Sequence, residues 1–228
     1  MGVFISRCMA PVFVVVLLAE PLLFGQEPVP TPAVALERLK EGNGRFAADK
    51  PAAKKIDAKR RAELANGQHP FAVILTCADS RVAPELVFDQ SLGDIFVLRV
   101  AGNIADRAVI GSIEYAVEHL HTPLIVVLGH ESCGAVKAAL QGKPLPGDLG
   151  WLVQQVHVGD KLPEDKQGRL KAGIQANVLH AATELTERSS AIKELAASNR
   201  IQIVSGVYSL TSGEVDWLKM PKAKTEKK

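Results

Sequence analysis

The hydrophobic residues of the chain are concentrated in short runs that polar and glycine-containing segments separate. Three runs are almost entirely apolar, which is typical of strands buried on both faces of a parallel sheet. They are residues 71–76 (FAVILT), 95–100 (IFVLRV) and 124–128 (LIVVL). Helix-like patterns alternate with these runs, so we predict an α/β fold with a mostly parallel central sheet flanked by helices.

Apolar residues at helical intervals predict the remaining elements. Two helices, at 34–49 and 57–66, precede the first apolar run and would form an N-terminal helical arm. A Pro- and Gly-rich stretch at 143–150 has no regular element assigned. The other predicted elements are helices at 108–119 and 135–142, helical patterns over roughly 170–198, and strands at 201–208 and 215–218.

Residues 1–25 have the pattern of a secretory signal peptide. Arg7 provides a positive start, an apolar run of 11 residues follows at 9–19, and Glu20 and Pro21 interrupt it. Because a membrane span needs about 20 apolar residues, we expect a cleaved leader, with an uncleaved N-terminal membrane anchor as the alternative. The mature protein would then be periplasmic or secreted, with no stable membrane span.

The rest of the chain divides into a linker, one domain and a tail. Proline alternates with other residues at 26–33 (QEPVPTPA), which predicts an extended linker. Residues 34–220 form a single predicted domain, because a domain typically has about 150 residues. The basic residues 221–228 are predicted to be a disordered tail.

Composition excludes several classes of function. The chain has 27 Lys and Arg against 25 Asp and Glu, and only its last eight residues form a basic run, so no nucleic-acid partner is expected. Two Trp and two Tyr are too few for stacking platforms that hold sugars or single strands. Three cysteines, at positions 8, 77 and 133, do not make a disulfide scaffold.

Chemically active residues follow two of the predicted strands. Residues 77–81 (CADSR) come after the first strand, and residues 130–134 (HESCG) come after the third. Because sites in open α/β sheets form beyond the carboxyl ends of the strands, both clusters can meet in one crevice. Two Cys, one His and one Asp are ligand types that tetrahedral zinc takes. The alternatives are a structural zinc site, or two inert buried thiols with Asp79 as a capping residue.

Other motifs are excluded by inspection. Gly129 and Gly134 have the spacing of a phosphate-binding loop, but Ala135 and Val136 stand where that loop needs Lys and Ser or Thr. No G-x-S-x-G motif surrounds Ser132, and the two cysteines are too far apart for a C-x-x-C redox pair.

With these residues in view, the sequence closely resembles the β-class carbonic anhydrases. The resemblance covers essentially the whole expected mature chain, from the EGNGRF segment at 41–46 to the GVY segment at 206–208. The residues that carry it are 77–81, Gly102-Asn103, Glu114-Tyr115-Ala116, Gly129-His130 and Cys133-Gly134.

The resemblance implies a zinc-dependent enzyme. The reaction would be the reversible hydration of carbon dioxide to bicarbonate and a proton, by attack of a zinc-bound hydroxide. Residues 34–220 would form the catalytic zinc domain, with one zinc ion per subunit, in a homodimer or homotetramer. By match to the family motifs, Cys77, His130 and Cys133 hold zinc, and Asp79 with Arg81 forms the catalytic pair.

The resemblance also implies two states of this site. When the Arg81 guanidinium clamps the Asp79 carboxylate, the site is open, and when Arg81 releases it, Asp79 becomes a fourth zinc ligand in a closed state. Bicarbonate-gated members carry a Trp where this chain has Ile74, and members that look permanently open carry Gln-x-Pro, as in Gln68-His69-Pro70. We therefore expect the open state here.

Four further residues match substrate-binding positions of the family. Gln68 would donate a hydrogen bond to a substrate oxygen across the dimer interface, and the backbone N–H of Gly134 would face substrate. Phe96 and Tyr115 would line an apolar pocket suited to a gas. Without the resemblance, Gln68 would be interpreted as a polar turn residue, and Phe96 and Tyr115 as core residues.

Two rival functions remain at this point. Relatives that resemble this fold hydrolyse carbon disulfide or carbonyl sulfide with the same zinc and the same Asp and Arg pair. A catalytically silent zinc protein, acting as a bicarbonate binder or a scaffold, would not need Asp79 and Arg81. The remaining histidines could relay protons, since imidazole titrates near neutral pH, although His157 and His180 have the character of surface or helix residues.

Overall fold

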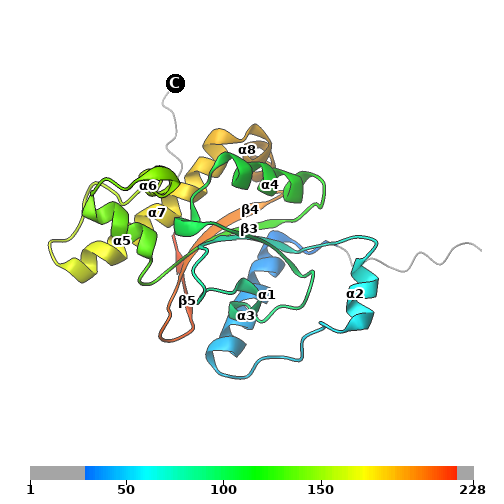
Figure 1. The fold of residues 1–228 in the computed structure, drawn as a ribbon. Coiled ribbons are helices and arrows are strands. Elements are labelled where there is room, and N and C mark those ends of the chain that lie inside the picture. The colour runs from blue at the N-terminus through cyan, green and yellow to red at the C-terminus, as the bar shows by residue number, and fades with distance from the viewer. Residues whose placement is uncertain (1–28, 220–228) are drawn as a thin grey trace, which may run out of the picture.

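The chain folds into one central sheet of five strands that has helices on both faces (Figure 1). The computed structural model describes residues 29–219, so the predicted signal peptide, residues 26–28 of the linker and the basic tail lie outside the described residues. The strands are β1 (Ala72–Thr76), β2 (Ile95–Arg99), β3 (Leu124–His130), β4 (Gln202–Tyr208) and β5 (Val215–Leu218). The helices are α1 (Pro32–Ala47), α2 (Ala58–Leu64), α3 (Pro84–Val87), α4 (Arg107–Glu118), α5 (Gly134–Gln141), α6 (Gly147–Gln154), α7 (Lys166–Arg188) and α8 (Ser190–Ala197), with a short 3₁₀ helix, η1 (Ala101–Asn103).

The strand order is β2-β1-β3-β4-β5, and every pair is parallel except β4 with β5. The prediction of a mostly parallel α/β sheet is therefore confirmed. All residues of β1 and β3 are buried, which explains their continuous apolar runs, whereas β2 lies at an edge of the sheet and is only partly covered.

Two apolar layers cover the two faces of the sheet (Figure 1). On one face, Val73 and Ile125 pack with α4, α7 and α8. On the other face, Ile74 and Val126 pack with α1 and with the end of α3. Because side chains of a strand alternate between faces, each central strand contributes to both layers and holds them in one core.

The structure corrects several predicted boundaries. Strand β3 continues two residues beyond the apolar run and ends at His130. Helix α1 begins at Pro32, because Thr31 caps it by accepting a hydrogen bond from the Val34 N–H, so the end of the predicted linker is helical.

Two further differences concern helices. Helix α6 begins inside the Pro- and Gly-rich stretch, after Pro146, and continues to Gln154. The helical patterns predicted over 170–198 correspond to two helices, because Ser189 adopts an extended conformation and its hydroxyl caps α8 by accepting from Ile192 N–H. The four-residue α3 was not predicted, since its length is too short for a periodic pattern.

The EGNGRF segment joins α1 to the rest of the domain. The Asn43 side chain donates to the carbonyls of Val87 and Gly213 and accepts from the N–H of Val215. A Cβ at Gly42 would lie 1.9 Å from the Phe88 carbonyl oxygen, so only glycine permits this approach of α1 to α3. The packing of α1 against the rest of the domain therefore explains Gly42 and Asn43 of this segment.

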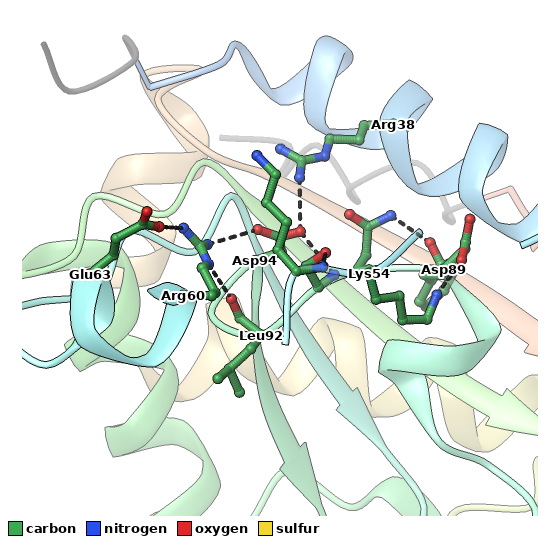
Figure 2. A network of polar contacts seen from close by, with 11 residues as sticks. Arg38, Lys54, Arg60, Glu63, Asp89, Leu92 and Asp94 are labelled. Carbon is green, nitrogen blue, oxygen red and sulfur yellow. Dashed lines mark hydrogen bonds and ion pairs between the residues drawn. The ribbon is translucent and has the colours of Figure 1, made fainter. Parts of the chain in front are cut away.

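Ion pairs hold the helical arm in place (Figure 2). Arg38 of α1 and Arg60 of α2 both contact the Asp94 carboxylate, at 3.0 and 3.3 Å. The buried Asp89 carboxylate pairs with Arg45 at 2.6 Å and with Lys54. Both carboxylates lie between α3 and β2, so they fix the arm against the start of the edge strand.

Within residues 29–219, no helix has the length and apolarity that crossing a membrane would require.

We expect Asp89→Asn to lower the free energy of unfolding by about 2 kcal/mol at pH 7, the value that its pKa shift corresponds to, because it leaves two cations facing a buried neutral group. Burial raises the pKa of Asp89, but hydrogen bonds from the Ala52 N–H, Lys54 and Arg45 outweigh it and lower the pKa to about 2. The ionised form thus stabilises the fold above the unfolded pKa of about 4, and this contribution is lost as the pH falls towards 2. Urea unfolding of both proteins should show their difference shrinking over that range. The exposed Asp160→Asn should match the wild type throughout, and a variant as stable as the wild type at pH 7 would contradict the prediction.

Candidate metal centre

Neighbouring strand ends bring three metal-binding side chains together. Cys77 directly follows β1, His130 ends β3, and Cys133 caps the start of α5. Thr76 pairs with Leu128, so Cys77 and His130 leave the sheet side by side. The two sulfur atoms and a ring nitrogen lie within 4.8 Å of one another, and all three residues are buried. The convergence expected from the sequence is thus present in the structure.

One nitrogen of His130 is left without a partner. Its Nδ1 lies 2.8 Å from the Glu131 carbonyl oxygen and donates to it, which leaves Nε2 as an acceptor. Nε2 is buried and has no hydrogen-bond partner among the described residues. Such an unpaired buried atom costs about 1–3 kcal/mol. A metal ion bound through Nε2 would remove that cost, so the residues present fit a zinc ion.

The turn that carries His130 and Cys133 is itself held in place. The Glu131 N–H donates to the Tyr208 carbonyl of β4 at 3.0 Å. The Glu131 carboxylate accepts from the Ser209 hydroxyl and the Leu210 N–H, at 3.0 and 3.1 Å. These bonds fix the carbonyl that orients the His130 ring.

The two neighbouring thiols lose their first proton easily and hold the second one strongly. A hydrogen bond from Cys133 is the main cause that lowers the pKa of Cys77 to about 4, against burial, and the Gly102 N–H adds to it. The same hydrogen bond raises the pKa of Cys133, even though the N–H groups of Ala135 and Val136 at the start of α5 stabilise its thiolate. The first thiolate therefore forms easily, and a divalent cation would displace the second proton.

Asp79 lies beside these ligands and is held by Arg81. Arg81 Nε donates to Asp79 Oδ1 at 2.9 Å, and Nη2 donates to Oδ2 at 2.7 Å. These hydrogen bonds hold the pKa of Asp79 well below its usual range, against burial. Asp79 Oδ2 is 3.9 Å from His130 Nε2, so the carboxylate borders the ligand set.

The four predicted substrate residues fall into two groups. Gly134 is the first residue of α5, next to Cys133, and the space where a Cβ would lie is empty. Gln68 and Tyr115 instead line a surface cavity of about 870 Å³, and the Phe96 ring centroid is 6.5 Å from that of Tyr115. Within residues 29–219, no hydrogen bond or ring contact joins this second group to the metal-binding side chains. Tyr115 is 48% exposed and is therefore not a core residue.

Sequence reasoning missed two residues that support the site. Arg99, at the end of β2, donates to the carbonyls of Cys77 and Asp79, at 3.3 and 2.6 Å. Asn177 of α7 donates to the Gly102 carbonyl at 2.6 Å. Asn177 had one signal in the sequence, since it is a polar residue on the otherwise apolar face of a predicted helix.

Known proteins with similar sequences and structures are carbonic anhydrases. The carbonic anhydrase family model matches residues 72–215, more than half of the chain. Carbonic anhydrase 2 of Mycobacterium tuberculosis is 48% identical over 191 residues (82% of this chain and 92% of that protein), and a carbonic anhydrase of Mycolicibacterium smegmatis is 44% identical over 200 residues (83% and 94%).

Solved structures agree with this match. A β-carbonic anhydrase of Coccomyxa in complex with acetazolamide has a TM-score of 0.65 at 26% identity, over 82% of this chain and 85% of that chain. One of two tetrameric β-carbonic anhydrases from Sordaria macrospora has a TM-score of 0.62 at 25% identity, over 82% and 95%. The chain therefore belongs to the β-carbonic anhydrases, the family that catalyses the reversible hydration of carbon dioxide.

Proposed function

We propose that this carbonic anhydrase is zinc-dependent and that its reaction takes place where Cys77, His130 and Cys133 converge. The observation that carries the proposal is the unpaired Nε2 of His130, buried within 4.8 Å of two thiols. A zinc ion held by these three side chains would activate a water molecule for attack on carbon dioxide at neutral pH.

Asp79 and Arg81 would orient the attacking water. Asp79 is ionised at neutral pH and can accept a hydrogen bond from that water. Arg81 occupies both carboxylate oxygens with its side chain and also donates its backbone N–H to Oδ1 at 3.0 Å. Held in this way, the carboxylate does not move onto the metal, so we propose the open state as the resting state.

Gly134 would contact substrate through its backbone. The N–H of this first residue of α5 is free of an intrahelical partner, and the positive end of the helix dipole favours the negative charge that develops on the substrate oxygens.

Two observations favour carbon dioxide hydration over the rival functions. The similar proteins with 44–48% identity are named carbonic anhydrases, which argues against carbon disulfide or carbonyl sulfide as the main substrate. A silent zinc scaffold has no use for a carboxylate that a bidentate arginine holds beside the ligands.

We further propose that the protein is a homo-oligomer, dimer or tetramer, in which Gln68, Phe96 and Tyr115 of one subunit complete the site of the other. Gln68 and Tyr115 are exposed on their own subunit, and Leu92 beside them is 44% exposed. The tetrameric assembly named for the Sordaria proteins is consistent with an oligomer.

The signal peptide at 1–25 remains a prediction from the sequence, and with it we propose a periplasmic or secreted location. N-terminal sequencing of the exported protein would test both, because a chain that retains Met9–Ala19 would indicate the membrane anchor instead.

We expect Asp79→Asn to lower kcat/KM for carbon dioxide hydration by at least about 100-fold, because the neutral amide cannot hold the water in the same orientation. In the wild type, stopped-flow rates should rise smoothly between about pH 6.5 and 9 as the attacking water loses its proton, and Asp79, ionised throughout that range, adds no second transition. The exposed Asp216→Asn serves as the control and should keep full activity. Abrupt loss of wild-type activity below about pH 8 would instead indicate a closed site, in which Asp79 binds the metal.

Metal removal should abolish activity and zinc should restore it. His130→Ala removes the only nitrogen ligand, so we expect its zinc content after dialysis to fall far below one ion per chain. His180→Gln changes a half-buried histidine of α7 that stacks on His157, outside the metal-binding group, and should keep full zinc content. Elemental analysis of both variants distinguishes the outcomes, and an unchanged zinc content in His130→Ala would refute this assignment of the ligands.

If each active site contains residues of two subunits, two inactive variants should complement each other in a mixed dimer. In a heterodimer of Asp79→Asn with a Gln68→Ala, Tyr115→Ala double variant, one site carries both defects and the other carries neither. Random pairing should therefore recover about a quarter of wild-type activity from two inactive parents. If each chain completed its own site, co-expression would recover nothing.

A further inference from the structure

Asn177 is a buried polar residue in the middle of the long helix α7. It is 1% exposed, and its neighbours Ile174, Val178 and Ala181 on the same helix face are apolar core residues. A polar side chain placed there loses its contacts with water, so it must gain hydrogen bonds that an apolar residue could not make.

Both ends of the Asn177 amide bind backbone outside its own helix. Its Nδ2 donates to the Gly102 carbonyl at 2.6 Å, and its Oδ1 accepts from the His157 N–H at 3.0 Å. One side chain thus joins α7 to η1 and to the segment that follows α6. The segment after α6 leads into α7, whereas Gly102 of η1 lies 75 positions from Asn177 in the sequence.

Gly102 connects this amide to the metal centre. The Gly102 N–H donates to Cys77 Sγ at 3.3 Å. Gly102 has a φ of +72°, and a Cβ there would lie 3.0 Å from Val156 and 3.1 Å from Ala135. Since glycine is freer than other residues to rotate about its backbone, the direction of its N–H depends on what holds its carbonyl. In this structure the side chain that holds that carbonyl is Asn177.

We propose that Asn177 is a positioning residue of the metal centre, which aims the Gly102 N–H at Cys77 Sγ and thereby sets the affinity of the site for its metal. The proposal rests on the proposed role of Cys77 as a ligand. A donor to a thiolate withdraws charge from the sulfur and restricts its position, and changes to such supporting bonds typically alter metal affinity by about 10- to 100-fold.

The test uses Asn177→Asp in the full chain. Aspartate has the same shape and keeps an acceptor for the His157 N–H, but it places a carboxylate oxygen against the Gly102 carbonyl. The control is Leu185→Ala, on the same helix, fully buried and packed in the core that includes α4 and α8. Leu185→Ala loses packing without touching the hydrogen-bond chain, and thermal unfolding of the metal-free proteins measures what each variant loses in stability.

The readouts are zinc affinity, from competition with a chromophoric chelator, and the sulfur-to-metal charge-transfer band of the cobalt-substituted protein. We expect Asn177→Asp to bind zinc about 10- to 100-fold more weakly and to shift the cobalt band. Leu185→Ala should leave both unchanged even when it unfolds at a lower temperature.

The proposal is overturned if Asn177→Asp keeps the wild-type affinity and band. It is also overturned if the affinity of both variants falls in step with their stability, because Asn177 would then be a packing residue. A wild-type chain that takes up neither zinc nor cobalt would refute the proposed function itself, and this inference with it.

Discussion

The parallel pairing of β1 with β3 is the constraint on which the rest of the site depends. It sets Thr76 opposite Leu128 and so brings Cys77 and His130 to the same edge of the sheet. A shift of this register by one residue would turn every side chain of a strand to the opposite face and separate the ligands. The register is fixed because both strands are buried on both faces, so a shift would also disrupt two apolar layers at once.

Much of this arrangement could be predicted from the sequence. Continuous apolar runs identify the central strands, and the residues that follow those strands are the metal-binding ones. Local irregularity was harder to predict, since α6 begins within a Pro- and Gly-rich stretch and a single serine, Ser189, separates α7 from α8. The hydrogen bonds of Arg99 and Asn177 could not be predicted, because they join residues 20 to 75 positions apart through backbone carbonyls that have no sequence signature.

The Asp79 carboxylate is useful in this site only while it is restrained. It borders the ligands at 3.9 Å, where it can orient a water molecule, yet the same closeness makes it a competitor for the metal. Arg81 is the restraint, and its side chain is 53% exposed, whereas that of Asp79 is 18% exposed. The geometry therefore places the more accessible half of the pair in contact with solvent, where dissolved anions can reach the guanidinium.

The Asp94 ion pairs lie just before β2, at the amino ends of the parallel strands, whereas the metal-binding side chains lie at the carboxyl ends of β1 and β3. Residues that confer stability on the arm are thus separated from the metal-binding side chains of the same subunit. In many enzymes, changes that raise stability lower activity, because the same residues affect both. Here the ion pairs of the arm can adapt to a harsher environment while the loops that carry the metal-binding side chains of the same subunit remain unchanged.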